Sequence, residues 1–193
     1  MIKKDINQND ILNSELLNII DYNYIFDENP IKRTKTKPTL ENTISKLEIL
    51  KNNIEAIQNC NLKKNASKIV FADGNIQSPI MIIGEGPGQK EDELGKPFVG
   101  DAGNLLNKML KAINIEREKI YITNVVNYRP PNNRKPEPSE INRYSEYLKE
   151  HISIINPKIL ILMGSTAMEA LLGSNKRISK ERGQWKEVII KPN

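Results

Sequence analysis

Three short, strand-like runs alternate with helical patterns from Pro79 onward, and this alternation restricts the fold most. The runs are Ile80–Ile83, Ile120–Val126 and Ile159–Met163. The first and third runs are continuously apolar, as is typical of strands that are buried on both faces, and the second is rich in β-branched residues. Because helical spacing separates them, the pattern predicts a mostly parallel sheet with helices on both sides.

The helices are predicted from apolar residues three or four positions apart. One begins near Asp101, a residue type that caps helices, one at Pro138, and a short one covers residues 165–172 before Gly173. Trp185–Ile190 is predicted as a fourth strand. The predicted fold is α/β, a three-layer α/β/α sandwich with a central, mostly parallel four-stranded sheet. The expected apolar faces are Leu105, Leu106, Met109, Leu110 and Ile113 in the first helix, and Ile141, Tyr144, Leu148, Ile152 and Ile155 in the second.

The first 40 residues differ in pattern from the rest. Ile11–Tyr24 has the spacing of an amphipathic helix, and Asp27–Pro38 reads as a linker because prolines and basic residues interrupt it. Helical spacing returns over Leu40–Gln58. We therefore predict a helical N-terminal extension over residues 1–40 and one domain over residues 41–193. The role of the extension stays open between partner docking and disorder.

Charge and composition narrow the class of protein. A net charge of +5 and a pI near 9.1 favour a polyanionic partner, although an AT-rich genome would also enrich Lys, Asn and Ile. The single cysteine, Cys60, excludes an intramolecular disulfide and a metal site made of several cysteines. No apolar run approaches the roughly 20 residues that span a bilayer, and no signal peptide is evident. We expect a soluble cytoplasmic protein.

A glycine-rich loop, Gly84–Gly88, follows the first strand. In parallel sheets, ligands bind beyond the carboxyl ends of the strands. The loop fits neither phosphate-binding motif, since Gln89 stands where a dinucleotide fingerprint needs glycine and the Gly-Lys-Ser/Thr of a P-loop is missing. The carboxylates of Glu91, Asp92 and Glu93 would also repel a phosphate. A nucleotide-binding or nucleotide-hydrolysing protein is therefore disfavoured.

The segment around this loop, Gly84–Gly103, resembles the first motif of the iron–sulfur (family 4) uracil-DNA glycosylases. The similarity continues through Ile122–Val126, Arg129–Arg134 and Arg182–Trp185, and it extends over residues 57–190. The resemblance implies an enzyme that removes uracil from DNA in base-excision repair. The implied partner is uracil-containing DNA, and the protein is expected to be a monomer. Shorter matches lie at Val70–Asn75, Pro157–Lys158, Gly164 and Ala167.

The resemblance also assigns roles to individual residues. Phe98 would stack on the uracil, and Asn124 would pair with its edge, because a side-chain amide offers both a donor and an acceptor. Catalytic roles fall to Glu85, Gly86 and Glu91, although Glu91 is equally well explained as a solvated loop charge. Glu85, Gly86 and Pro87 would also line the uracil pocket. Arg129, Arg134 and Lys135 would contact DNA phosphates; a generic basic surface is the alternative.

One departure from the family concerns its cofactor. The family binds a 4Fe-4S cluster through four cysteines, and their places here are Ile57, Cys60, Tyr128 and Tyr144. Isoleucine and tyrosine cannot replace thiolates, so we predict no cofactor and no metal. We expect the bulky replacements to pack as a hydrophobic plug, with Cys60 as a remnant of the ligand set.

A second departure concerns the family's His-Pro-Ser/Ala segment. It would follow Arg182–Trp185, and the sequence does not contain it, so the domain is expected to be truncated at its C-terminus. His151 cannot substitute, because it falls late on a helix, away from the strand ends. Loss of one donor to the leaving uracil anion costs ~10²–10³ in rate, so activity is expected to be impaired. The alternative is a non-catalytic descendant that binds DNA or a flipped base. Strand preference, other deaminated bases and whether the chain is a fragment stay open.

Overall fold

The computed structural model describes residues 39–173 and 175–190. The predicted helix at Ile11–Tyr24 and the linker at Asp27–Pro38 lie outside the described residues, as does the rest of the N-terminal extension. The predicted boundary after residue 40 stays a prediction. The first described helix, α2, runs from Leu40 to Glu55 and begins after Thr39, whose side chain accepts a hydrogen bond from the Asn42 backbone N–H.

A four-stranded sheet forms the centre of the domain, in the order β1-β3-β2-β4. β2 (Ile80–Gly84) pairs in parallel with both β3 (Tyr121–Asn124) and β4 (Ile159–Leu162), while the short β1 (Ala72–Gly74) runs antiparallel to β3. This confirms the predicted α/β class with a mostly parallel sheet of four strands. The register pairs Gly84 with Asn124, so the two central strands end side by side.

The fourth strand is β1, and the prediction of a strand at Trp185–Ile190 is wrong. Those six residues form no ladder with any described strand, and β4 is the edge of the sheet. A strand is stable only when its backbone groups pair, and the side chains of Trp185 and Ile189 are 83% and 80% exposed instead of packing on a layer. The β-branched residues of this segment favour a strand, but without a pairing partner they do not form one.

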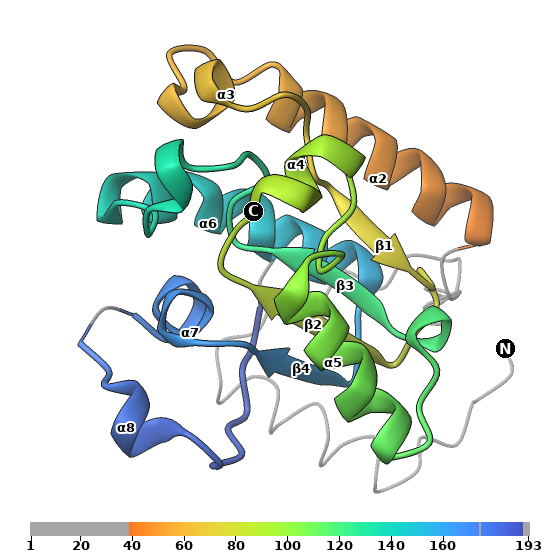
Figure 1. The fold of residues 1–193 in the computed structure, drawn as a ribbon. Helices are drawn as coiled ribbons and strands as arrows, with labels where there is room; N and C mark the ends of the chain where they lie inside the picture. The colour runs from red at the N-terminus through yellow and green to blue at the C-terminus, as the bar shows by residue number, and fades with distance from the viewer. Residues whose placement is uncertain (1–38, 174, 191–193) are drawn as a thin grey trace, which may run out of the picture. The chain divides into compact units, whose positions relative to one another are not determined.

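Helices cover both faces of the sheet, with α5 (Asp101–Ala112) in front and α6 (Pro138–Ile155) behind in Figure 1. Alternate residues of β2 supply both cores, because successive side chains of a strand point to opposite faces. Met81 and Ile83 pack with α2, α6 and α7 (Ser165–Leu172), whereas Ile82 packs with α5. All five residues predicted for the apolar face of α6 are buried. The three-layer arrangement is thus confirmed.

Helix α5 differs from its prediction in two respects. Its N-cap is Gly100, and Asp101 lies in the first turn, where it pairs with Lys90 at 3.2 Å. Of the predicted apolar face, Leu106 and Leu110 are buried, because only this narrow stripe reaches the sheet. The other three residues, Leu105, Met109 and Ile113, are more than half exposed.

Short elements complete the described part of the chain. They are α3 (Asn61–Asn65), α4 (Gln89–Leu94), α8 (Ile178–Glu181) and two 3₁₀ turns, η1 (Arg117–Lys119) and η2 (Pro131–Asn133). Within residues 39–173 and 175–190, no helix combines the length and the apolar composition that crossing a membrane requires.

Candidate active site

Phe98 and Asn124 meet at the end of β2, next to the Cα atom of Gly84. A Cβ atom added to Gly84 would lie 2.4 Å from Asn124 Oδ1 and 2.6 Å from two carbons of the Phe98 ring. Glycine is therefore required at this position, because any side chain would collide with both neighbours. The structure thus brings together an aromatic ring and a side-chain amide that the sequence separates by 26 positions, next to the glycine loop.

The side chain of Asn124 has no protein partner within the described part of the chain, and its amide atoms keep a small contact with solvent. Asn124 is 3% exposed, yet no other described residue forms a hydrogen bond with its side chain. Asn127, three residues later and equally buried, donates from Nδ2 to the carbonyl of Val70 at 3.2 Å. Buried polar groups nearly always find partners, since an unpartnered one costs about 1–3 kcal/mol. Asn127 is therefore structural, whereas Asn124 is available to a ligand.

Phe98 has an unusual backbone conformation. Its φ is +53°, in the left-handed region that bulky residues rarely adopt and that costs about 1–3 kcal/mol. Gly103 in the first turn of α5 makes room for this turn, because a Cβ there would lie 1.9 Å from the carbonyl oxygen of Phe98. Such strain persists only where surrounding contacts impose it, and it is concentrated at ligand-binding positions.

Glu85 follows Gly84 and is held by a residue that the sequence analysis missed. The hydroxyl of Thr166 donates to Glu85 Oε2 at 2.5 Å, from the first turn of α7. Thr166 is fully buried, whereas Glu85 is partly exposed at the loop. Its position along the chain could have identified it, because Thr166 lies just beyond the carboxyl end of β4, where parallel sheets bind their ligands. Side-chain chemistry alone does not distinguish this threonine from others.

The carboxylate of Glu91 is occupied by the backbone of its own loop. Oε2 accepts from the N–H of Gly88 at 3.1 Å, and Oε1 accepts from Val99 at 2.9 Å and Gly100 at 2.7 Å. These bonds tie the start of α4 to the segment that carries Phe98. The geometry gives Glu91 a structural role, and its catalytic role stays a prediction that this arrangement does not favour.

The remaining loop residues, Gly86 and Pro87, lie against the segment after β3. A Cβ on Gly86 would be 2.7 Å from a methyl group of Val126 and 3.8 Å from Pro130. Pro87 is buried. The glycine loop therefore packs closely on the start of the segment with the predicted DNA-binding residues, but the uracil-binding roles of Gly86 and Pro87 stay predictions.

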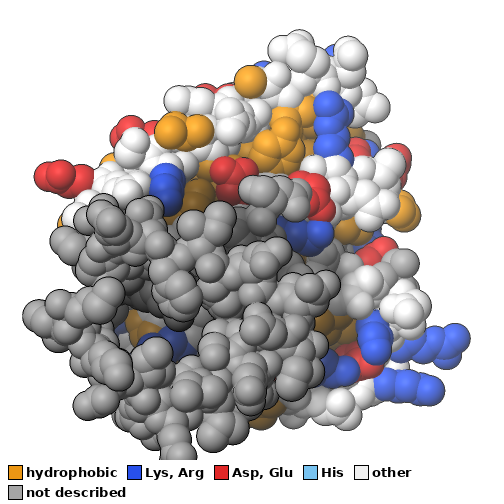
Figure 2. Space-filling model, turned by 180° about the vertical axis from the view of Figure 1, so that it is seen from behind, with side chains coloured by type: hydrophobic (Ala, Val, Ile, Leu, Met, Phe, Trp, Pro, Cys, Tyr) orange, Lys and Arg blue, Asp and Glu red, His pale blue; other side chains and the backbone are white. Residues whose placement is uncertain are grey.

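The predicted phosphate contacts are mostly paired with carboxylates. Arg134 binds both oxygens of Glu140, at 2.8 and 2.7 Å, and this contact lowers the pKa of the Glu140 carboxyl. Lys135 lies 3.6 Å from Glu169. Arg129 donates through Nε to Asn133 Oδ1 at 2.7 Å. Basic and acidic side chains are likewise interspersed over the described part of the face in Figure 2. The DNA-binding roles stay predictions, and Arg129 is the cation least neutralised by a described carboxylate.

His151 lies away from Asn124, as expected. It is 2% exposed in α6, where its Nε2 is 2.8 Å from the hydroxyl of Tyr121 and its ring stacks on Phe71 at 4.6 Å. Tyr121 and Asn124 point to opposite faces of β3, because their positions differ by an odd number. Burial lowers the pKa of His151 to about 3, so the ring is neutral at physiological pH. His151 therefore belongs to the core.

Comparison with known proteins assigns the chain to a family. The sequence profile of the uracil DNA glycosylase superfamily matches residues 71–192. The chain belongs to this superfamily. The family predicted from Gly84–Gly103 is thus confirmed, and with it the prediction of an enzyme family.

Several relatives of the chain carry the name type-4 uracil-DNA glycosylase. The one from Thermotoga maritima is 41% identical over 138 residues, which cover 71% of this chain and 72% of the relative. The one from Sulfurisphaera tokodaii is 41% identical over 158 residues, covering 76% and 72%. The one from Saccharolobus solfataricus is 43% identical over 144 residues, covering 72% and 67%. The similarity therefore spans most of both partners.

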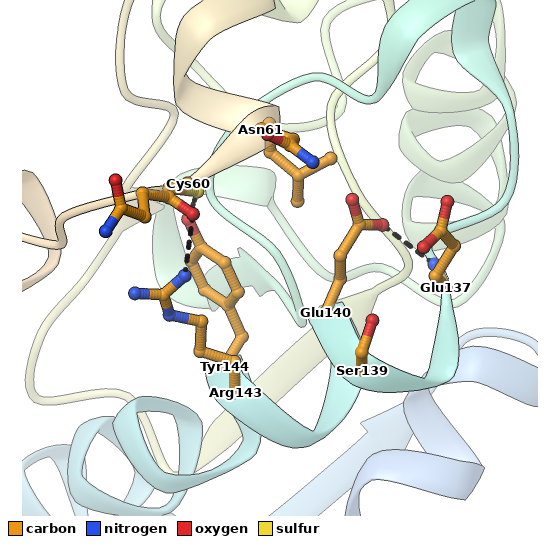
Figure 3. A pocket seen from close by; sticks show the side chains of 9 residues that line it. Cys60, Asn61, Glu137, Ser139, Glu140, Arg143 and Tyr144 are labelled. Carbon is orange, nitrogen blue, oxygen red and sulfur yellow. Dashed lines mark hydrogen bonds between the residues drawn. The ribbon is translucent and has the colours of Figure 1, made fainter.

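The four positions that the sequence resemblance matches to the cluster ligands lie in one hydrophobic core. Ile57, Cys60, Tyr128 and Tyr144 are all buried and belong to the same packed cluster as α2 and α6. The sulfur of Cys60 lies 3.4 Å from the hydroxyl of Tyr144, which reaches it from α6 (Figure 3). Burial raises the pKa of Tyr128 to about 12, and burial together with the contact to Cys60 also raises the pKa of Tyr144.

These residues do not fit a four-iron cluster. Such a cluster needs four thiolates, and the set offers one thiol, two phenols that stay protonated at neutral pH, and an aliphatic side chain. No three His, Cys, Asp or Glu residues of the described chain come together as a metal site. A cavity of about 230 Å³ lies beside Cys60 and Tyr144, but its charged residues already have partners: Arg143 donates to the carbonyl of Asn59 at 3.2 Å, and Glu140 binds Arg134.

Proposed function

We propose that this chain is a uracil-DNA glycosylase that hydrolyses the N-glycosidic bond of a uracil flipped out of DNA, as in base-excision repair. Its superfamily, the names of its relatives and the geometry around Gly84 support this function. Enzymes that act on a base must extrude it, stack it and read its edge in a pocket. The residues around Gly84 are suited to stacking the base and to reading its edge.

The observation that carries the proposal is the unpartnered amide of Asn124 beside the ring of Phe98. Uracil presents an N3–H donor and an O4 acceptor on adjacent positions. A side-chain amide complements this pair, because its carbonyl accepts from N3–H and its NH₂ donates to O4. The Phe98 ring supplies a face on which the base stacks. A bound uracil would supply the hydrogen-bond partners that the amide of Asn124 lacks in the folded protein.

Glu85 is suited to the reaction at the sugar. Thr166 occupies Oε2, which fixes the carboxylate and leaves Oε1 free to accept a hydrogen bond from a water molecule. The negative charge of Glu85 also stabilises the positive charge that develops on the deoxyribose as the bond to the base breaks. The water oxygen bonds to C1′, the C1′–N1 bond breaks, and uracil departs with the bonding electrons. The water's proton ends in solvent or on the released base.

DNA contacts would come from the segment after β3. Arg129 keeps most of its donors available, because within the described residues it donates only through Nε. Arg134 and Lys135 would have to exchange Glu140 and Glu169 for phosphates. Such contacts orient the DNA without reading its sequence. We expect the protein to act as a monomer.

We further propose that the domain folds without an iron–sulfur cluster. Ile57, Tyr128 and Tyr144 fill the region with packed side chains, and Cys60 makes a sulfur–hydroxyl contact with Tyr144. The hydrophobic plug expected from the sequence is consistent with the burial of all four positions. No step of the proposed reaction involves iron.

The proposed function is tested by incubating excess protein with an oligonucleotide that contains one uracil, followed by alkali to cleave abasic sites. Strand breaks at the uracil that disappear in an Asn124→Ala variant would support it. Absence of breaks together with retained affinity for DNA would reject the enzyme and favour the alternative, a non-catalytic protein that binds DNA or a flipped base. The protein is kept in excess because the single histidine, His151, is buried away from Asn124, so turnover is expected to be slow.

A further inference from the structure

We propose that Arg117 is a positioning residue for Phe98, holding the ring where the flipped base would stack. The inference rests on the proposed function only for its activity readout, because the contacts between Arg117 and the Phe98 turn are present without DNA. Arg117 lies in η1, and neither the glycine loop nor the strand ends include it. It was not among the residues singled out from the sequence.

The guanidinium of Arg117 makes five hydrogen bonds, as many as its N–H donors. Nε and one NH₂ group donate to Asp73 Oδ2 at 3.2 and 3.0 Å, and the same NH₂ group donates to the carbonyl of Pro97 at 2.7 Å. The other NH₂ group donates to the carbonyl of Phe98 at 3.0 Å and to Asn107 Oδ1 at 3.2 Å. The side chain is 15% exposed, so solvent competes little for these bonds.

The two carbonyl contacts fix the conformation of Phe98. Peptide groups are planar, so the φ and ψ of a residue describe how its two flanking peptide planes are rotated. The carbonyls of Pro97 and Phe98 belong to those two planes, and Arg117 holds both. This is the residue with a φ of +53°, a conformation that needs support from its surroundings. Arg117 supplies that support through both carbonyls.

Two further elements anchor the guanidinium. Asp73 in β1 provides its counter-charge at 3.0 Å, and Asn107 in α5 accepts one of its protons. The contacts therefore connect the antiparallel strand, helix α5 and the Phe98 turn. A lysine at this position would keep the charge but could not reproduce a planar fork that reaches four partners. Arg117→Lys thus separates geometry from charge.

The activity test is a double-mutant cycle with Phe98→Ala, using single-turnover cleavage of the uracil oligonucleotide. Arg117→Lys is expected to lower the rate by about 10- to 100-fold, because displacement of a positioning contact has effects of this size. In the Phe98→Ala background the same change is expected to have less than about a twofold effect, because the ring it positions is gone. Lys119→Gln, in the same 3₁₀ turn but 70% exposed and paired only with Glu116, is the matched control.

Amide hydrogen exchange tests the proposal independently of activity. Arg117→Lys is expected to speed exchange in a peptide covering residues 97–100, while the core strands exchange as before. Equal rate effects with and without Phe98 would overturn the proposal, as would unchanged exchange at residues 97–100 or faster exchange throughout the domain. If the wild-type chain releases no uracil, the proposed function fails, and the exchange result alone decides the role of Arg117.

Discussion

The hydroxyl of Thr166 donates a hydrogen bond to the carboxylate of Glu85, which joins the first turn of α7 to the loop after β2. Thr166 follows the edge strand β4, and Glu85 follows the central strand β2. These two strands are parallel neighbours, so their carboxyl ends lie side by side in the sheet. The hydrogen bond to Oε2 holds the carboxylate of Glu85 in place. Its other oxygen, Oε1, can then accept a hydrogen bond from the water of the proposed reaction. The residues of the proposed site thus come from three separate segments: one carries Glu85 and Phe98, the second carries Asn124, and the third carries Thr166.

Thr166→Val is expected to slow uracil release by roughly tenfold or more, because a hydrogen bond to a charged group contributes about 1.5–3 kcal/mol. Valine has nearly the shape of threonine, so the buried side chain still packs. Thr166→Ser keeps the hydroxyl and is expected to stay within a few-fold of the wild type. The measurement is single-turnover cleavage of a uracil oligonucleotide. Equal rates for the valine and serine variants would show that the hydroxyl does not orient Glu85.

Asn124→Ala and Asn127→Ala are expected to have opposite effects on activity and stability. Removal of the Asn124 amide should lower the rate by ~10²–10³ and leave the free energy of unfolding unchanged or higher, because no protein hydrogen bond is lost. Removal of the Asn127 amide breaks its bond to Val70 and should destabilise the fold by about 1–3 kcal/mol. Urea unfolding and single-turnover cleavage measure the two quantities. If Asn124→Ala destabilised the fold as much as Asn127→Ala, Asn124 would be structural.

The stability of the domain is expected to fall as the pH drops below about 6.5, because of His151. Burial lowers the pKa of His151 to about 3 in the fold, so between these values the unfolded chain binds a proton that the folded chain does not. The free energy of unfolding should therefore decrease by up to about 1.4 kcal/mol per pH unit in this range. Urea unfolding at about pH 7 and about pH 5 measures this slope, above the range in which most carboxylates titrate.

His151→Gln is the control for this pH dependence. Glutamine retains an acceptor for the hydroxyl of Tyr121 and does not titrate. The variant is expected to be less stable than the wild type near neutral pH, since it loses the stacking on Phe71, but its stability should change less between the two pH values. A slope identical to that of the wild type would assign the pH dependence to other groups.

Iron is expected to be absent from the purified protein, and a chelator should leave its melting temperature unchanged. The physical reason is that Ile57, Tyr128 and Tyr144 offer no thiolates around Cys60. The converse test restores the thiolates in a triple variant, Ile57→Cys, Tyr128→Cys and Tyr144→Cys. This variant should acquire iron and visible absorption on reconstitution with iron and sulfide. Elemental analysis measures both. Stoichiometric iron in the wild-type chain would contradict the cofactor-free fold.

Much of the fold was predictable because burial leaves a strong signal in the order of residues. The apolar runs at Ile80–Ile83 and Ile159–Met163 became central and edge strands, and the spacing in Pro138–Ile155 identified the buried face of α6. The short β1 was not predictable, since alanine, aspartate and glycine have little preference for strands. It is held there by tertiary contacts, such as the Thr123 hydroxyl donating to the carbonyl of Phe71.

The site was predictable in part, through its resemblance to a family. Phe98 and Asn124 were identified in advance, and the structure brings them together at Gly84. Thr166 and Arg117 were missed because the partner of Thr166 lies 81 positions away and those of Arg117 lie 10 to 44 positions away, and no local spacing reveals such contacts. The ion pairs of Arg134 and Lys135 were also missed, because a sequence shows cations but not which carboxylates neutralise them.

The most direct test of the proposed function is chromatographic detection of the free base released from DNA by the full chain. Oligonucleotides that contain uracil, cytosine or thymine at one position would be compared under single-turnover conditions, with Asn124→Ala as the matched variant. Release of uracil, with little cytosine or thymine and with a loss of ~10²–10³ in rate for Asn124→Ala, is the predicted result. No release of uracil at any protein excess, or release that Asn124→Ala leaves unchanged, would contradict it.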